Sequence, residues 1–168
     1  MFELPPQDTS QTPSGTIHNA VPKSAVNPIV LYDGICGLCN RLIQFLLKRD
    51  LRDRFRFASL QSEFASSLLR SHGVDGIDLD TVYVVVDQGR ESERLLARSD
   101  AVLQVLGELG GVWSVSRLGG VVPRLIRNRI YDLVARNRYR IFGKYDSCLL
   151  PDKRHQHKFL DLAVPKVR

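Results

Sequence analysis

Short apolar runs alternate with amphipathic segments over residues 29–109, which is typical of a layered α/β protein. The run at 29–32 is apolar throughout and ends at an Asp-Gly pair, so it predicts a buried strand. Apolar residues then recur at helical spacing as far as Lys48 and Arg49, two basic residues that suit the end of a helix. The alternating segment 55–58 predicts a second strand.

Two further helices and a hairpin complete this pattern. One helix is expected to begin at Ser59 or Gln61. Residues 81–86 are β-branched nearly throughout and predict the strongest strand, and residues 94–97 could pair back to them as a hairpin. The pair Ser99-Asp100 is most simply the N-cap of the last helix, which Gly110-Gly111 would end.

The resulting order β-α-β-α-β-β-α is that of a thioredoxin-like fold. A helix joins the first two strands, so they are expected to be parallel with a right-handed crossover. The strand at 29–32 should then lie inside the sheet. We therefore predict an α/β protein with a thioredoxin-like mixed sheet flanked by helices, to which a basic C-terminal helix is added.

A long basic helix is predicted after Trp113, ending at Gly143. Its apolar residues recur at helical spacing and predict a stripe that packs back onto the sheet while the arginines face water. The stripe comprises Val122, Leu125, Ile126, Ile130, Leu133 and Val134, and the arginines are Arg124, Arg127, Arg129, Arg136, Arg138 and Arg140. A docking surface for an acidic partner, a membrane surface or nucleic acid is the alternative interpretation of this helix.

Composition divides the chain into four parts. Residues 1–27 are rich in Pro, Ser, Thr, Gln and Asn and predict a disordered tail. Residues 28–112 form the predicted thioredoxin-like core, and residues 113–150 the helical extension packed on it. Residues 151–168 are predicted to be a polar tail, whose histidines, His155 and His157, would be solvent-exposed without a chemical role.

Charge is distributed unevenly over the 168 residues, whose net charge is +6. Residues 1–112 contain 11 Lys/Arg and 14 Asp/Glu, a net charge of −3, whereas residues 113–168 contain 13 and 4, a net charge of +9. No aromatic platform or nucleic-acid motif accompanies this basic region, so nucleic acid is not the expected partner. No apolar run is long enough to span a membrane, and the pattern of the first residues predicts no secretory leader. The sequence contains only three cysteines. We therefore predict a reducing, cytoplasmic location.

The candidate chemistry lies where the first strand meets the first helix, at Cys36 and Cys39. Unpaired backbone N–H groups and the helix dipole at a helix N-terminus stabilise a thiolate, which is the attacking species. Cys36 is predicted to be the exposed nucleophile, and Cys39, one turn further in, the buried resolving thiol. Gly34 and Gly37 are expected to leave room for a substrate backbone beside the sulfurs.

Asp33 precedes Cys36 by three residues and is the third candidate catalytic residue. Its carboxylate could accept a proton from Cys39, although a nearby negative charge would also raise the pKa of a thiol. A turn or helix-capping role is the alternative interpretation, and both roles are compatible.

The segment Tyr32-Asp33-Gly34-Ile35-Cys36-Gly37-Leu38-Cys39-Asn40 resembles the DCC family, named for its Asp-x-x-Cys-x-x-Cys motif and described as thiol-disulfide oxidoreductases. The block 131–140 and the segment from Phe142 to Cys148 resemble the C-terminal block of that family. The resemblance covers residues 28–151 and implies a thioredoxin-like fold and dithiol redox chemistry at Asp33, Cys36 and Cys39. In thioredoxins a cis-proline precedes the strand that faces the cysteines, whereas residues 79–81 contain no proline.

Two alternatives to redox chemistry stay open. Cys36 and Cys39 could be half of a structural zinc site, for which Cys148, His155 and His157 are the other candidate ligands. The fold could also be a non-catalytic binding module that uses its arginine-rich helix as the interaction surface. Cys148 is interpreted as a buried or partly exposed thiol, or as the partner of Cys36 in a mixed disulfide.

We favour a thiol-disulfide oxidoreductase that needs no metal or cofactor. Its expected partner is a thiol or disulfide substrate, glutathione or a protein. By analogy with glutaredoxins, the helix start at Ser99-Asp100 could bind the carboxylate of glutathione.

Overall fold

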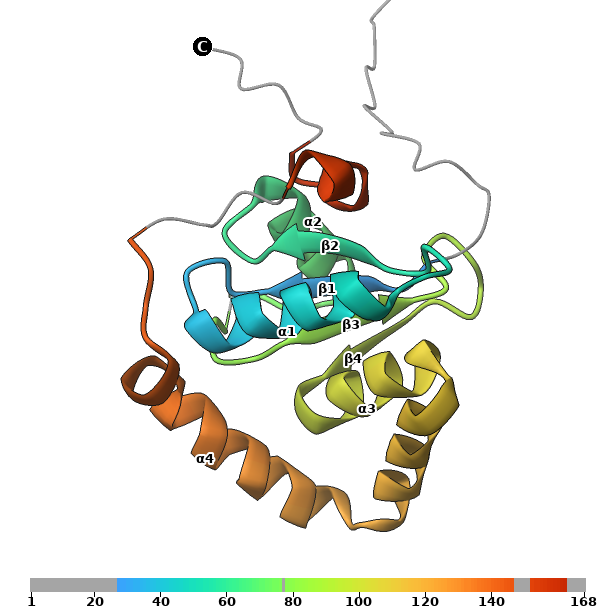
Figure 1. Ribbon diagram of the computed structural model, residues 1–168, viewed down its shortest axis with the longest axis vertical. Helices are drawn as coiled ribbons and strands as arrows, with labels where there is room; N and C mark the ends of the chain where they lie inside the picture. The colour runs from blue at the N-terminus through green and yellow to red at the C-terminus, as the bar shows by residue number, and fades with distance from the viewer. Residues whose placement is uncertain (1–26, 77, 147–151, 163–168) are drawn as a thin grey trace, which may run out of the picture.

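The computed structural model describes residues 27–76, 78–146 and 152–162. Cys148 and all of the predicted disordered tail except Asn27 lie outside the described residues. Within them, four strands form one mixed sheet in the order β2-β1-β3-β4 (Figure 1). The strands are β1 Ile29–Tyr32, β2 Arg56–Ser59, β3 Tyr83–Val86 and β4 Arg94–Ala97.

Strand pairing confirms the predicted thioredoxin-like fold. Strand β1 lies inside the sheet, parallel to β2 and antiparallel to β3. Strands β3 and β4 form the predicted hairpin. The carboxyl end of β1 is therefore inside the sheet, and the chain continues from there into the cysteine-bearing turn.

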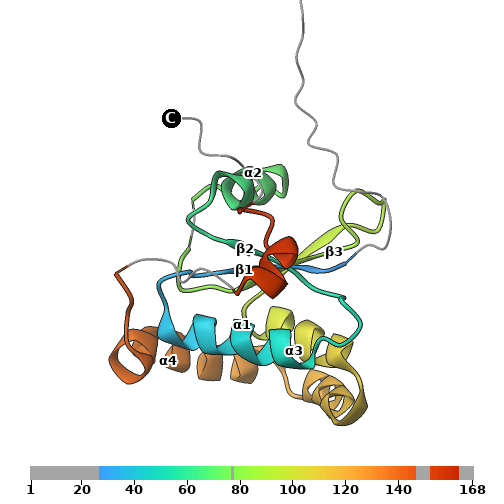
Figure 2. The ribbon, with the colours of Figure 1, turned by 45° about the horizontal axis from the view of Figure 1, so that its top comes forward.

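Helices cover both faces of the sheet. Figure 2 shows α2 on one side and α1 and α3 on the other. The helices are α1 Gly37–Arg49, α2 Glu63–Ser71 and α3 Arg98–Leu109. In β1, Val30 and Tyr32 pack toward α1 and α3, whereas Ile29 and Leu31 pack toward α2. Burial on both faces explains why this strand is apolar throughout.

The structure corrects two predicted helix starts. Helix α2 is capped by Ser62, whose Oγ accepts a hydrogen bond from the backbone N–H of Ala65 at 3.1 Å, and not by Ser59 or Gln61. Helix α3 begins at Arg98, so Ser99-Asp100 lies in its first turn and is not its N-cap. The predicted C-terminal stops are confirmed, since Gly110 and Gly143 cap α3 and α4 with positive φ angles.

The C-terminal extension consists of a 3₁₀ helix, η1 Gly111–Val121, followed by α4 Arg124–Phe142. The predicted burial of its apolar stripe is wrong. Five residues of that stripe are between 42% and 67% exposed, namely Leu125, Ile126, Ile130, Leu133 and Val134. Helix α4 contacts the core with its polar side instead, because that side carries groups that hydrogen-bond to α3, to the β3 region and to Asp33.

The predicted polar tail also contributes to the core. Residues Lys153–Lys158 form a short 3₁₀ helix, η2, and Phe159 after it is 4% exposed and pairs with Phe57 in a parallel bridge. Lys158 is buried and places its Nζ 2.8 Å from Oδ2 of Asp50. This pair ties the segment to the end of α1. No helix of the described residues is both long and apolar enough to cross a membrane.

Candidate active site

The two cysteines lie at the N-terminus of α1, as the sequence predicts. Cys36 is the N-cap, in an extended conformation, and Cys39 lies in the first turn. Both are free thiols, and the nearby backbone N–H groups of Leu38 and Cys39 lower the pKa of Cys36. The helix N-terminus therefore supplies the donors that a thiolate requires.

Hydrogen bonding between the two sulfurs makes them chemically unequal. The Cys39 thiol donates to Cys36, and this bond, together with the backbone donors and the charge of Arg138, lowers the pKa of Cys36 to about 6 although burial opposes the shift. The same bond, followed by burial, raises the pKa of Cys39. The surroundings of the pair therefore favour the thiolate at Cys36 and the thiol at Cys39.

Cys36 is not exposed, contrary to the prediction. The segment Gly143–Tyr145, here called the strap, runs across it as an isolated antiparallel bridge between Cys36 and Lys144. Gly37 N–H donates to the carbonyl of Gly143 at 3.1 Å, and Tyr145 N–H donates to the carbonyl of Ile35 at 2.8 Å. Cys36 is 0% exposed and Cys39 6% exposed. Sequence reasoning missed this cover because the strap lies far along the chain.

Gly37 leaves room for a backbone, as predicted, but that backbone belongs to this chain. A Cβ at Gly37 would lie 2.0 Å from the carbonyl oxygen of Phe142 and 3.0 Å from that of Gly143. Gly34 donates its N–H to Oε1 of Gln61 at 3.1 Å. The strap therefore occupies the position beside the sulfurs that we expected a substrate to use.

Replacing Gly37 with alanine is expected to displace the strap. The added methyl group cannot fit beside Phe142, so the variant should lose about 1–3 kcal/mol of unfolding free energy and alkylate faster at Cys36. Thermal melting and the rate of iodoacetamide labelling measure the two effects. Gly120→Ala is the matched control, because a Cβ there meets no atom within 4 Å. Equal labelling rates in the two variants would contradict a covering role for the strap.

Asp33 is fully buried directly after β1, and four donors surround its carboxylate. It accepts hydrogen bonds from the Ile35 N–H at 3.1 Å, from Nε2 of Gln61 at 2.7 Å and from the Tyr139 hydroxyl. Nη2 of Arg138 lies 3.3 Å away. The bond to Ile35 confirms the predicted turn role, whereas the helix-capping role is wrong, since the N-cap of α1 is Cys36 and the Ile35 N–H lies before the helix.

Arg138 links α4 to this carboxylate. Its side chain is 3% exposed, so the prediction that it faces water is wrong. Besides Asp33, it pairs with Asp80 at 2.7 Å and donates to the carbonyl of Leu79 at 3.0 Å. Its Nη2 also donates to the Tyr139 hydroxyl at 2.8 Å. Burial, and then the bond to Asp33, raises the pKa of Tyr139 to about 12, so this group stays a phenol and a donor.

The loop that would carry a cis-proline in thioredoxins is held by side chains of α4. Arg138 binds Leu79 and Asp80, and the Tyr131 hydroxyl accepts the N–H of Val82 at 2.8 Å. The peptide bonds of the described residues are all trans. Helix α4 thus stabilises the loop that faces the cysteines.

Helix α4 also covers the start of α3, where the glutaredoxin analogy placed an anion. Ser99 donates from its hydroxyl to Oδ1 of Asn128 at 2.5 Å, and Asp100 pairs with Arg127 at 2.9 Å and with Arg124 at 3.2 Å. Asp100 and its two arginine partners therefore occupy the N-terminus of α3. The expected binding of a glutathione carboxylate there is therefore not supported.

Four residues of this site were not identified from the sequence as site residues. Arg138 and Tyr139 lie within the C-terminal block that carried the family resemblance, which was the available signal. Asn40 donates from Nδ2 to the carbonyls of Gly34 at 2.9 Å and of Cys36 at 3.0 Å. Together with Gln61 it fixes the turn that carries the cysteines.

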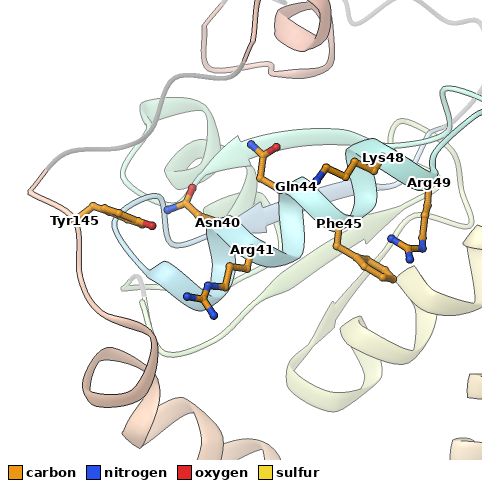
Figure 3. A pocket seen from close by; sticks show the side chains of 7 residues that line it. All are labelled: Asn40, Arg41, Gln44, Phe45, Lys48, Arg49 and Tyr145. Carbon is orange, nitrogen blue, oxygen red and sulfur yellow. The ribbon is translucent and has the colours of Figure 1, made fainter.

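A groove of about 360 Å³ runs along α1 beside the strap (Figure 3). Its lining includes three basic side chains and comprises Asn40, Arg41, Gln44, Phe45, Lys48, Arg49 and Tyr145. Asn40 and Tyr145 also belong to the cysteine turn and the strap, so one end of the groove adjoins the covered dithiol.

Within the described ranges, candidate metal ligands do not gather at the cysteines. No group of three or more His, Cys, Asp or Glu residues in the described part of the chain could hold a metal ion. His157 lies 3.6 Å from Asp53, beside η2. Cys148, the third thiol of the zinc alternative, lies outside the described residues.

Sequence comparison agrees with this geometry. The model of the DCC1-like thiol-disulfide oxidoreductases matches residues 30–144, which include both cysteines, Asp33 and Arg138. The chain belongs to this family. It is 37% identical to the uncharacterized protein YuxK of Bacillus subtilis over 134 residues, 80% of this chain and 94% of that protein. It is 35% identical to a chloroplastic DCC family protein of Arabidopsis thaliana over 124 residues, 73% of this chain and 69% of that protein. No solved structure matches significantly.

Proposed function

We propose that this DCC family member catalyses thiol-disulfide exchange with Cys36 as the nucleophile and Cys39 as the resolving thiol. The observation that carries the proposal is the placement of the pair, with Cys36 at the N-cap of α1 and Cys39 in its first turn, where the pKa of Cys36 is lowered and that of Cys39 is raised. A disulfide exchange enzyme needs one group that is a thiolate at neutral pH and a second that stays protonated until the first has reacted.

The reaction proceeds in two steps. The Cys36 thiolate attacks one sulfur of a substrate disulfide, a mixed disulfide forms, and the other substrate sulfur leaves as a thiolate. Cys39 then loses its proton and attacks the sulfur of Cys36, which releases the second substrate sulfur. The substrate disulfide is reduced by two electrons, and the Cys36 and Cys39 thiols are oxidised to a disulfide.

Formation of the mixed disulfide itself activates Cys39. The largest cause of its raised pKa is the hydrogen bond to Cys36, whose negative charge disappears when the mixed disulfide forms. The pKa of Cys39 should then fall. We assign to Asp33 the role of receiving that proton or positioning its acceptor, because its fully buried carboxylate is close enough to Cys39 for its charge to raise the pKa of that thiol.

A thiol or disulfide, either glutathione or a protein, is the proposed substrate, and the cytoplasm remains the predicted location. The basic side chains of the α1 groove favour a substrate that carries negative charge. The strap must move before any substrate reaches Cys36, since that residue is 0% exposed.

A non-catalytic binding module is the second candidate function, and the cover over Cys36 is the observation that favours it. The reduction potential of the Cys36–Cys39 pair, measured in a glutathione redox buffer, separates the two candidates. Reversible formation of the disulfide supports the enzyme. A dithiol that stays reduced at every buffer ratio supports the binding module.

The pH dependence of alkylation tests the thiolate directly. Labelling of Cys36 should rise with pH, reach half its maximum near pH 6 and level off above about pH 7, because only the thiolate reacts. The Cys36→Ser variant provides the background from the other thiols. A half-maximum near 8.5, the value of a free cysteine, would contradict the proposed nucleophile.

A further inference from the structure

Helix α4 packs on the rest of the protein with its polar side, whereas an ordinary amphipathic helix packs with its apolar side. Its polar side chains face the body: Arg127 pairs with Asp100 at 2.9 Å, and Tyr131 accepts the backbone N–H of Val82 at 2.8 Å. Arg138, buried beside Asp33, anchors the far end. The helix cannot turn its apolar side inward without breaking these bonds.

The outward side of α4 is consequently apolar. Ile126, Ile130 and Leu133 are 50%, 59% and 60% exposed, and Ile141 near the end of the helix is 66% exposed. Single exposed apolar residues are common in soluble proteins, whereas a row of them along one helix indicates an interaction surface.

The 3₁₀ helix η1 adds a second apolar row. Its exposed residues recur at every third position, which places them on one side of a 3₁₀ helix. They are Val112, Val115, Leu118 and Val121, and their exposed fractions lie between 64% and 82%. The other side of η1 packs on the body through Trp113, whose ring lies 5.0 Å from that of Phe45. Figures 1 and 2 show η1 and α4 joined along one border of the molecule, away from α2.

Arginines flank the apolar row of α4. Arg129, Arg136 and Arg140 are exposed and follow one another at intervals of seven and four residues, so they share one side of the helix. The one acidic residue in the sequence of this helix, Asp132, faces Arg98 at 3.5 Å. The free surface of α4 is therefore apolar and positively charged.

We propose that η1 and α4 form a docking surface for an anionic lipid bilayer. A helix with an apolar row and neighbouring arginines lies in the plane of the membrane interface, where the apolar side chains enter the acyl boundary and the guanidinium groups contact anionic headgroups. Charge disfavours a second copy of the chain as the occupant, because pairing two α4 helices would bring their arginine rows together.

Docking in this way holds the dithiol near the membrane. The same helix carries Arg138 and ends at the strap, so the surface that meets lipid is one helix away from Cys36. The proposal concerns where the protein binds and does not depend on the redox role of the cysteines.

Vesicle co-sedimentation with the full-length protein tests the proposal. Wild-type protein should bind vesicles of phosphatidylcholine and phosphatidylglycerol, bind phosphatidylcholine alone far more weakly, and dissociate as salt increases. Replacing Arg129, Arg136 and Arg140 with glutamine should weaken binding on the order of a hundredfold. The double variant Ile130→Gln/Leu133→Gln should weaken it at least about tenfold, because the apolar contribution is lost.

Leu51→Gln and Arg52→Gln are the controls, since both residues are exposed and belong to neither η1 nor α4. Cys36→Ser should bind as wild type does, which keeps this test separate from the redox proposal. Absence of binding to anionic vesicles would overturn the proposal. If the arginine variant loses binding but Ile130→Gln/Leu133→Gln binds as wild type does, the proposal is also overturned, because adsorption would then be electrostatic only. A wild-type dimer in light scattering that Ile130→Gln/Leu133→Gln converts to a monomer would assign the surface to a second copy.

Discussion

Cys39→Ser is expected to accumulate a stable mixed disulfide between Cys36 and a disulfide substrate, whereas Cys36→Ser should form none. The thiolate is expected at Cys36 because the Cys39 thiol, the donors at the helix N-terminus and Arg138 stabilise its charge. Without Cys39, no group attacks the mixed disulfide, so this intermediate accumulates. Each single variant should therefore lose essentially all turnover, although only one of them loses the first reaction.

Mass spectrometry of each variant, after incubation with oxidised glutathione, measures the adduct. The double variant Cys36→Ser/Cys39→Ser is the control for adducts at the remaining cysteine. An adduct on Cys36→Ser but not on Cys39→Ser would reverse the assignment. Equal adducts on both would mean that the helix N-terminus does not distinguish the sulfurs, and would favour the binding module.

Arg138→Met is expected to be the most destabilising single substitution in α4, with a loss of about 3–5 kcal/mol in unfolding free energy. The substitution removes the cation beside Asp33, a fully buried carboxylate, and an uncompensated buried charge is strongly unfavourable. It also removes a positive charge that lowers the pKa of Cys36, so the pH profile of alkylation should move upward. Chemical denaturation and the labelling profile measure the two effects.

Arg136→Met is the matched control, because Arg136 is exposed and, among the described residues, donates within its own helix to the carbonyl of Asp132 at 3.2 Å. It should change stability by less than about 0.5 kcal/mol. Adding Asp33→Asn to Arg138→Met should recover part of the loss, since the buried charge is removed with its partner. Equal stability of Arg138→Met and Arg136→Met would show that the ion pair does not hold α4 on the core.

The order of the elements along the chain and the place of the cysteines could be predicted because both follow from local patterns. Strand β1 is apolar throughout because both of its faces are covered, and its Asp-Gly end identifies the turn into α1. The helix ends at Gly110 and Gly143 could also be predicted from the local sequence, since both positions need a positive φ angle, which favours glycine. The predicted start of α3 was wrong because serine is a common N-cap residue, whereas the Ser99 hydroxyl donates a hydrogen bond to Asn128 of α4.

The sequence by itself determined the thioredoxin-like core and the position of Cys36 and Cys39 at the start of α1, because short-range periodicity and a helix N-terminus are encoded within a few neighbouring residues. Only the tertiary structure decided which side of α4 faces the core. Periodicity shows that one side of α4 is apolar. However, Arg138 pairs with Asp33, which is 105 residues away in the sequence, and this buried ion pair turns the apolar side outward. The cover over Cys36 likewise depends on two backbone hydrogen bonds between distant segments, and backbone pairing carries no side-chain signal in the sequence.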